Sequence, residues 1–309
     1  CNLCDYPAPE PEDLKSAIAA AHGSWGISPE QVLVGGGSMG VLVTLVRLLL
    51  RPGSVMSGVS PQFTDTVLQA LYNGASYDPA PLEAPRYTIE TGRLLEALGK
   101  KPEVLYLDRP HNPTGQVLPL DDVALLARSG METGTWVISD EAYGDFMADD
   151  ESAAVLDFPN LVTCRSFSKG PGAAGIRAGF AVTRDPELAV LFRKVQPPFV
   201  IGALDVCLAL EILKEPAFLA ETRAYVQMAK TRALDVVRHK RGWFAADTDD
   251  RGPIFLLSQE SGIVVHRLAA VGVSCEGGSG YFGMDDRSVR LRVPAPGKLE
   301  EFLERLSRA

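Results

Sequence analysis

The chain has 309 residues, with 30 Lys and Arg against 39 Asp and Glu, which gives a formal net charge of −9 at pH 7. This length suits one large or two ordinary domains with a sizeable core. Hydrophobic residues make up 46% and charged residues 22%, as in ordinary globular proteins, which argues against long disorder and fibrous repeats. The acidic balance argues against nucleic-acid binding, and no apolar run approaches the roughly 18 residues of a membrane-spanning helix.

The five cysteines are an odd number spread thinly over the chain, so we expect a reducing cytoplasm and no disulfide framework. Cys1 and Cys4 form a C-x-x-C motif, but no second Cys or His pair follows at zinc-like spacing. A redox or metal role for this pair is therefore the minor interpretation. Acidic residues such as Asp5, Glu12 and Asp13 interrupt the start of the chain, so it does not resemble a signal peptide.

Short apolar runs alternate with helical patterns over the first two thirds of the chain. Taken in order, the patterns predict helix 13–21, strand 31–34, helix 40–50, strand 54–59, helices 65–72 and 93–98, strand 104–107, helix 120–129, and strands 135–138, 161–164 and 179–183. Short apolar strands that alternate with helices indicate an α/β fold, with a mainly parallel sheet covered on both faces. Ligands bind such a sheet at the carboxyl ends of its strands.

The pattern changes after Pro197 and Pro198. A long helix is expected over residues 204–238, strands over 254–257 and 289–293, and an amphipathic helix over 298–306. We interpret this part as a second, smaller α+β domain. The expected division is a large domain over residues 25–203, followed by a linking helix and small domain over 204–309, with residues 1–24 packing on the small domain or on a partner subunit.

A glycine-rich loop follows the first predicted strand and opens a helix. It runs from Gly35 to Gly40 and satisfies G-x-G-x-x-G, the pattern of dinucleotide-binding loops. The next strand ends in Gly58-Val59-Ser60, without the carboxylate that would hold a ribose. We therefore favour a single phosphate bound at the helix N-terminus over a dinucleotide or a simple tight turn.

Polar residues follow the later strands at regular intervals. Asn112 lies in a rigid Pro/Gly turn, and Asp140 ends the strand 135–138. A carboxylate at the end of a buried strand needs a cation, a metal or strong donors. Asp140 could also serve as a helix N-cap. A metal bound by Asp140 would have only His111 as a nearby histidine ligand. Lys169, followed by glycines and Arg177, adds a Schiff-base-forming amine beside an anion site.

The four motifs together resemble the fold-type-I, class I/II aminotransferases that use pyridoxal 5′-phosphate, with the greatest resemblance to the branch of histidinol-phosphate aminotransferase and threonine-phosphate decarboxylase. The motifs are Asn112-Pro113-Thr114-Gly115, Asp140-Glu141-Ala142-Tyr143, Ser166-Phe167-Ser168-Lys169 and Gly175-Ile176-Arg177-Ala178-Gly179-Phe180. The resemblance covers essentially the whole chain and implies a three-layer large domain, a smaller α+β domain and the cofactor pyridoxal phosphate.

The resemblance implies a role for each site residue. Lys169 would hold the cofactor aldehyde as an aldimine and then move the substrate α-proton, with Asp140 and Tyr143 completing the catalytic group. Asp140 would pair with the protonated pyridine nitrogen, and Asn112 and Tyr143 would bind the phenolic oxygen. The remaining cofactor-binding residues would be Gly37, Ser38, Met39, Phe63, Ser166, Ser168 and Arg177, with Phe63 stacking on the ring.

The resemblance assigns two further residues, one to the site of a neighbouring subunit and one to the substrate. Tyr6 matches a tyrosine that contacts the phosphate of the neighbouring subunit, which implies a homodimer. Arg290 matches the arginine that clamps the substrate α-carboxylate near Asn112, and Arg292 is the competing assignment. Relatives place an N-terminal arm before the position of Tyr6, so the chain is expected to be short of its front end.

The substrate side departs from the family pattern. Phosphate-substrate enzymes carry an arginine between Gly272 and Gly283, where this chain has Glu276, so we doubt histidinol phosphate and threonine phosphate as substrates. Glu276 either meets a cationic side chain or lies in a solvated loop. The expected activity is amino transfer between an amino acid and a 2-oxo acid. A decarboxylase, lyase or oxidase acting on an amino acid is the alternative, and a ligand-sensing domain is the least favoured hypothesis.

Overall fold

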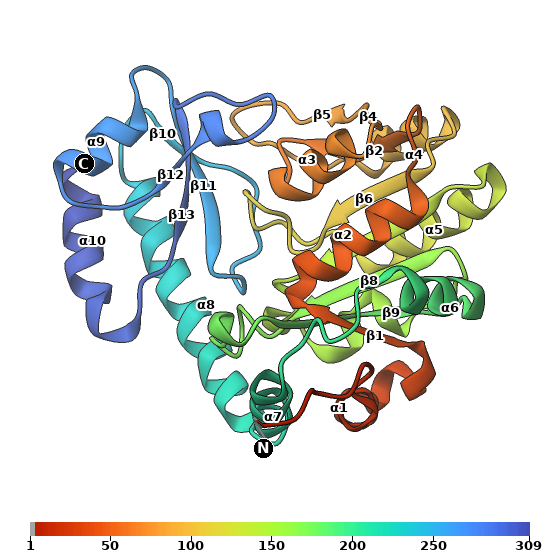
Figure 1. Ribbon diagram of the computed structural model, residues 1–309. Coiled ribbons are helices and arrows are strands. Elements are labelled where there is room, and N and C mark those ends of the chain that lie inside the picture. The colour runs from red at the N-terminus through yellow and green to blue at the C-terminus, as the bar shows by residue number, and fades with distance from the viewer. Residues whose placement is uncertain (1–3) are drawn as a thin grey trace.

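A seven-stranded sheet forms the centre of the larger part of the computed structural model, which describes residues 4–309 (Figure 1). Its strands, in the spatial order β1-β9-β8-β7-β6-β2-β4, are β1 (Val32–Gly36), β9 (Ala178–Thr183), β8 (Leu161–Ser166), β7 (Trp136–Glu141), β6 (Val104–Asp108), β2 (Val55–Ser57) and β4 (Ser76–Tyr77). Neighbouring strands from β4 to β8 are parallel, and β9 runs antiparallel to both β8 and β1. The prediction of a mainly parallel sheet is confirmed.

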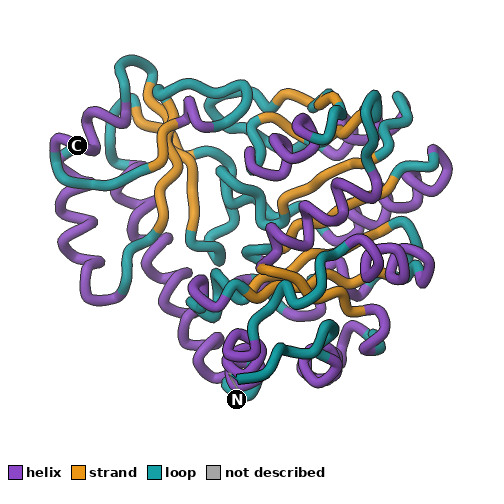
Figure 2. The backbone as a smooth tube through the Cα atoms, viewed as in Figure 1, coloured by secondary structure: helices purple, strands orange, loops and turns teal. Residues whose placement is uncertain are grey.

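Helices cover both faces of this sheet, as Figures 1 and 2 show. They are α1 (Glu12–Ala21), α2 (Gly37–Leu49), α3 (Thr64–Tyr72), α4 (Thr91–Gly99), α5 (Leu120–Thr133), α6 (Pro186–Val195) and α7 (Ala203–Ile212). Short 3-10 helices lie at Gly23–Trp25, Pro29–Gln31, Gly144–Phe146, Asp149–Glu151, Ala153–Val155, Ala174–Ile176, Gly278–Gly280 and Pro296–Lys298.

Strand β6 explains why the predicted strands are apolar without alternation. Val104 and Tyr106 pack with residues of α2, α3 and α6, whereas Leu105 and Leu107 pack with residues of α4 and α5. Successive side chains of a strand point to opposite faces of the sheet, so each face carries its own apolar layer. Three layers result, as the sequence predicts.

The smaller domain is built on a four-stranded antiparallel sheet of spatial order β10-β11-β13-β12. Its strands are β10 (Trp243–Ala245), β11 (Ile254–Gln259), β12 (Glu276–Gly277) and β13 (Ser288–Arg292), and its helices are α8 (Pro216–Arg238), α9 (Val264–Ala270) and α10 (Leu299–Arg308). One apolar core joins the three helices to β10, β11 and β13. The prediction of a smaller α+β domain is confirmed, although β10, β12 and α9 were not predicted.

The expected continuous helix over residues 204–238 is wrong. The chain forms α7 and α8 instead, and α8 begins at Pro216. Proline lacks the N–H that a continuing helix requires, and it disfavours helical geometry at Glu215, whose φ of −114° and ψ of 58° are not helical. Proline suits the first position of a new helix, where its missing N–H is not needed.

Three other elements differ from the sequence-based expectation. Strand 54–59 is divided into β2 and β3 (Val59–Ser60), and β3 pairs with β5 (Ala80–Pro81) in a separate small sheet. Helix α2 begins at Gly37, so part of the glycine-rich loop forms its first turn. Helix α6 was not predicted; Asp185 caps it by accepting a hydrogen bond from the Leu188 N–H at 2.8 Å.

The N-terminal helix packs on the large sheet. Leu14 and Ile18 of α1 are buried with Val32 and Val34 of β1, and α1 also contacts α7. None of the helices within residues 4–309 is long and apolar enough to cross a bilayer.

Candidate active site

The strand directions bring distant parts of the sequence to one edge of the sheet. Strands β1, β6, β7 and β8 all point the same way, because β9 reverses direction between β8 and β1. Their carboxyl ends, and the start of β9, therefore meet at the edge that faces the smaller domain (Figure 1). Every motif selected from the large-domain sequence follows one of these ends or precedes β9.

The first turn of α2 and the segment before β9 form a close-packed cradle. Gly37 has φ of +75°, and a Cβ there would lie 2.5 Å from Nη2 of Arg177. A Cβ on Gly179 would overlap the main-chain nitrogen of Ser38. Nη1 of Arg177 donates to Oγ of Ser168 at 3.3 Å. A guanidinium, a hydroxyl and a helix N-terminus thus converge at one place, which is the chemistry of a phosphate site.

Asp140 lies at the end of β7, next to the cradle. Its side chain accepts hydrogen bonds from the Ala142 N–H at 3.1 Å and from the Tyr106 O–H at 2.7 Å. Burial nevertheless raises the pKa of Asp140 to about 6. A cation placed against this carboxylate would restore the charged form, so the residue suits a partner such as a protonated pyridine nitrogen.

The adjacent Glu141 does not face the cavity, because successive side chains of a strand point to opposite faces of the sheet. Its Oε1 accepts from Nη1 of Arg109 at 2.9 Å and from the Ala153 N–H at 2.8 Å, and its Oε2 accepts from the Ser152 O–H at 2.5 Å. Glu141 is therefore a buried structural carboxylate, whereas Asp140 faces the cavity.

Asn112 joins the large domain to the smaller one. Its Oδ1 accepts hydrogen bonds from the Tyr281 O–H at 3.1 Å and from Nη1 of Arg290 at 3.0 Å. Arg290 also forms an ion pair with Glu276, its register partner between β12 and β13. Arg292 is exposed and is not part of the cavity lining. Of the two competing arginines, Arg290 faces the site.

Lys169 lies in the loop after β8. Its side chain is exposed, and its Nζ lies 5.2 Å from the ring centroid of the buried Tyr143. The amine is thus accessible to a carbonyl compound that enters the site, as a Schiff-base lysine must be.

One cavity of about 470 Å³ unites these groups. The residues of its lining that the sequence had selected are Ser38, Met39, Phe63, Asn112, Asp140, Tyr143, Ser166, Ser168, Lys169, Arg177 and Arg290. Gly37 lies behind Arg177, outside the lining. Tyr6 lies away from the cavity: it is 85% exposed, and its ring centroid is 5.2 Å from that of Phe199.

The lining also contains residues that the sequence analysis had not assigned. Asp108 is the last residue of β6, and the parallel register pairs it with Asp140. Asp65, in the first turn of α3, is exposed at the cavity. Glu276 is an exposed residue of the short strand β12 and does not lie in a loop. A signal for Asp108 exists, because it ends an apolar strand as Asp140 does. Nothing in the local sequence points to Tyr281.

The geometry does not support the metal alternative at Asp140. His111 is fully buried, its Nδ1 lies 2.7 Å from Oγ1 of Thr114 and its Nε2 lies 2.9 Å from the carbonyl oxygen of Pro61. Burial lowers the pKa of His111 to about 4, so the ring is neutral and occupied by these partners. Within residues 4–309, no three His, Cys, Asp or Glu side chains are arranged to hold a metal ion. Cys1 lies outside the described residues, so the C-x-x-C motif is not tested.

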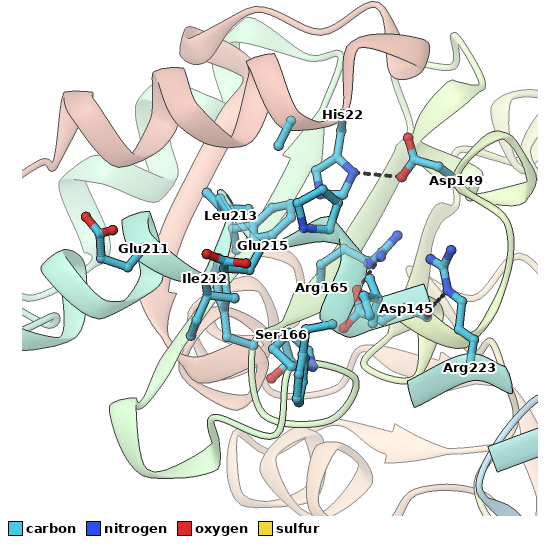
Figure 3. Close-up of a pocket in the computed structure, with 17 residues that line it drawn as sticks. His22, Asp145, Asp149, Arg165, Ser166, Glu211, Ile212, Leu213, Glu215 and Arg223 are labelled. Carbon is cyan, nitrogen blue, oxygen red and sulfur yellow. Dashed lines mark hydrogen bonds and ion pairs between the residues drawn. The ribbon is translucent and has the colours of Figure 1, made fainter. Parts of the chain in front are cut away.

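A second cavity, of about 600 Å³, borders the first at Ser166 (Figure 3). Within it, Nη2 of Arg165 donates to Oδ1 of Asp145 at 2.7 Å, and the His22 ring pairs with Asp149. Its lining contains neither Lys169 nor Asp140. The groups suited to carbonyl chemistry therefore belong to the smaller of the two cavities.

Comparison with known proteins identifies the family of the chain. The model of the family "Aminotransferase class I and II" matches residues 2–306. Histidinol-phosphate aminotransferase 1 of Mesorhizobium japonicum is 28% identical over 98% of this chain and 82% of its own length. The corresponding enzyme of Symbiobacterium thermophilum is 30% identical over the same shares, 98% and 82%. The crystal structure of histidinol-phosphate aminotransferase from Sinorhizobium meliloti in complex with pyridoxal-5′-phosphate superposes with a TM-score of 0.83, at 23% identity, covering 99% of this chain and 82% of that one.

These relatives favour amino-group transfer over the decarboxylase, lyase or oxidase alternative. Because the family match extends over nearly the whole chain, this protein belongs to the class I and II aminotransferases, enzymes of fold type I that transfer amino groups with pyridoxal 5′-phosphate.

Proposed function

We propose that the protein transfers an amino group between an α-amino acid without a phosphate group and a 2-oxo acid, with Lys169 as the residue that binds pyridoxal phosphate. The observation that carries this proposal is the single cavity that contains Lys169, Asp140, Asn112, Arg177 and Arg290 together. Its volume of about 470 Å³ lies within the range of small-molecule sites.

The residues fit the cofactor on two counts. Gly37 approaches Arg177 and Gly179 approaches Ser38 so closely that a Cβ at either position would clash, and this packing brings the guanidinium to the helix N-terminus, where a phosphate would bind. The buried Asp140 has a raised pKa and suits a cationic partner. When bound, the cofactor supplies an aldehyde that condenses with an amine and an electron-withdrawing ring that stabilises charge at the substrate Cα.

Each side chain of the cavity then has a separate role in binding the cofactor or moving a proton. Ser38, Ser168 and Arg177 hold the phosphate, and Asp140 keeps the pyridine nitrogen protonated. Asn112 and Tyr143 donate hydrogen bonds to the phenolic oxygen, while Phe63 covers the ring. Met39 and Ser166 complete the cofactor-binding wall. Lys169 Nζ would take the proton from the substrate Cα and hold it for the transfer.

Charge decides the substrate class. Among the described lining residues the cations are Lys169, Arg177 and Arg290, and each has a partner in this scheme: the cofactor aldehyde, the cofactor phosphate and the substrate α-carboxylate. Glu276 lies against Arg290, so no cation is left over for a second phosphate. A phosphorylated substrate would meet a carboxylate instead.

The test is a spectroscopic half-reaction. We expect the absorbance of the bound cofactor to change on addition of unphosphorylated amino acids and to recover on addition of a 2-oxo acid. Histidinol phosphate should react more slowly than the best amino acid. A Lys169→Ala variant should show neither change, and Lys214→Ala, in an exposed loop, is the matched control. Release of carbon dioxide, or turnover without an oxo acid, would refute amino transfer.

We also propose a homodimer in which Tyr6 reaches the phosphate of the neighbouring site. The exposure of Tyr6 and its distance from its own cavity support this. Light scattering should give twice the chain mass. A mixture of Lys169→Ala and Tyr6→Ala chains should recover activity, because one site of the mixed dimer has both residues. A fully active monomer would refute the dimer.

The domain boundaries and the compartment belong to the same proposal. We place the large cofactor-binding domain at residues 25–203 and the small domain, with the linking segment that forms α7 and α8, at 204–309, with residues 1–24 as an N-terminal segment. The sparse, odd-numbered cysteines support a reducing cytoplasm. Limited proteolysis and cell fractionation test the two points.

A further inference from the structure

Two carboxylates lie side by side at the floor of the cavity. Asp108 ends β6 and Asp140 lies near the end of β7, and the parallel register pairs the two residues directly. Their side chains therefore leave the same face of the sheet. They are only 7% and 5% exposed, and both line the cavity. Two buried carboxylates on directly paired residues of neighbouring strands cannot both ionise without a large electrostatic cost.

The hydrogen bonds of the two carboxylates differ. Asp140 receives two donors, the Ala142 N–H and the Tyr106 O–H. Asp108 receives the Phe63 N–H at Oδ2, at 2.9 Å, and the Tyr106 O–H and the Asn112 N–H lower its pKa to a smaller extent, but its buried Oδ1 has no partner within hydrogen-bond distance. A buried oxygen without a donor destabilises the charged carboxylate more than the neutral acid. The proton is therefore best placed on Asp108.

We propose that Asp108 and Asp140 hold one proton between them, on Asp108, and that Asp108 is a positioning residue that leaves Asp140 as the single charged carboxylate opposite the bound cofactor. The shared proton is a property of the empty protein and does not depend on the proposed function. The role opposite the cofactor rests on that function.

The titration behaviour of the pair supports this order. Burial raises the pKa of Asp108 to about 8, with the charge of Asp140 as the next cause, whereas the pKa of Asp140 rises only to about 6. Other ionisable groups that act on the pair are Tyr106 on β6, Tyr77 on β4, Cys164 on β8, Glu141 on β7 and Lys169 after β8. Burial raises the pKa of both tyrosines and of the thiol, so these three stay neutral and leave the proton on Asp108.

The arrangement has a consequence for the cofactor. One ionised carboxylate matches the single positive charge of a protonated pyridine nitrogen. The neutral Asp108 keeps its bond to the Phe63 main chain, so the side chain proposed to cover the ring stays tied to the floor of the cavity. Ionisation of Asp108 would add an unmatched buried charge.

Infrared spectroscopy of the cofactor-free protein tests the shared proton directly. A protonated carboxylic acid has a carbonyl stretch separate from that of a carboxylate. We expect one such band in the wild type near pH 7, well above the ordinary titration of aspartate, and its loss as the pH rises beyond about 8. The band should be absent in Asp108→Asn and retained in Asp65→Asn, which removes an exposed carboxylate from the same cavity.

Two other measurements keep the proposal testable if one of the variants folds poorly. In Asp140→Asn the band should persist but disappear at lower pH, because the charge of Asp140 helps to raise the pKa of Asp108. The melting temperature of cofactor-free Asp108→Asn should also exceed that of the wild type by an amount that grows from pH 5 to pH 8, reaching several degrees. A wild type without the band near pH 7, or an Asp108→Asn protein that retains it, would overturn the proposal. Failure of the amino-transfer assay would leave these readouts unchanged.

Discussion

Glu276 is ion-paired with Arg290, the guanidinium that faces the cavity and that we assign to the substrate α-carboxylate. The two residues are direct partners across β12 and β13, and Arg290 donates its other contact to Asn112. In the substrate-free protein, the Glu276 carboxylate thus occupies part of the Arg290 guanidinium that the substrate α-carboxylate would bind. Substrate binding must compete with this internal ion pair.

This competition predicts the effect of Glu276→Gln. The variant should lower KM for amino-acid substrates by about fivefold with little change in kcat, because a partly exposed ion pair contributes up to about 1 kcal/mol. Steady-state kinetics with several amino acids measures the effect. Glu300→Gln, which breaks an exposed pair with Arg232 on the small domain, is the control. An unchanged or higher KM would show that Glu276 does not compete.

The close approach of β9 to the glycine-rich loop predicts a loss of cofactor affinity in Gly179→Ala. The new Cβ would overlap main-chain atoms of Gly37 and Ser38, so the cradle must move. Overpacking of this kind costs about 1–3 kcal/mol, which corresponds to a loss of affinity of roughly 5- to 150-fold. Equilibrium binding of pyridoxal phosphate measures it. Gly175→Ala is the control, since no atom lies within 4 Å of its Cβ; equal losses in both variants would contradict the steric explanation.

Asp140 predicts how cofactor binding depends on pH. Its pKa of about 6 in the folded, cofactor-free protein exceeds the ordinary value, so the carboxyl gains a proton as the pH falls through 6. Only the charged form pairs with a protonated pyridine nitrogen. Affinity for pyridoxal phosphate should therefore fall by up to about tenfold per pH unit below 6. Asp140→Asn should bind pyridoxal phosphate less tightly than the wild type at pH 7. The cofactor's own titration affects both proteins equally, so only the wild type should show the additional loss of affinity below pH 6. Parallel pH profiles would refute the assignment.

The buried ion pair between Glu141 and Arg109 leads us to expect a loss of stability when Glu141 is replaced. Glu141→Gln would leave the buried Arg109 without its compensating charge, although the shape of the side chain is preserved. Removing one partner of a buried pair typically costs about 3–5 kcal/mol of unfolding free energy. Urea unfolding of the cofactor-free protein measures this loss. Glu132→Gln, on the exposed side of α5, should change stability by less than about 0.5 kcal/mol. A small effect of Glu141→Gln would mean that water or a shift of Arg109 compensates.

Much of the site was accessible from the sequence, because its residues follow recognisable strands. Asn112 and Asp140 each come after an apolar run that could only be a buried strand, and Lys169 follows another. In a parallel sheet such ends meet at one edge, so the order of motifs along the chain was enough to place the three in one cavity. The break at Pro216 was also visible in principle, since proline restricts its own N–H and the preceding residue.

Other features depend on pairing between distant strands, which local patterns do not encode. Nothing in the segment 178–183 says that β9 runs against its neighbours, yet this reversal brings Arg177 beside Gly37. The choice between Arg290 and Arg292 and the meeting of Arg290 with Glu276 likewise follow from the register of the small sheet.

The sequence by itself thus determined the α/β architecture and selected most of the residues that line the cavity, because apolar periodicity and strand-end motifs are local properties. Only the tertiary structure decided that Asp108 shares the floor of the cavity with Asp140, whereas Glu141 turns to the opposite face and binds Arg109. The physical reason is the pleat of the strand: successive side chains alternate between faces, so a shift of one residue in register exchanges a position facing the cavity for a structural one.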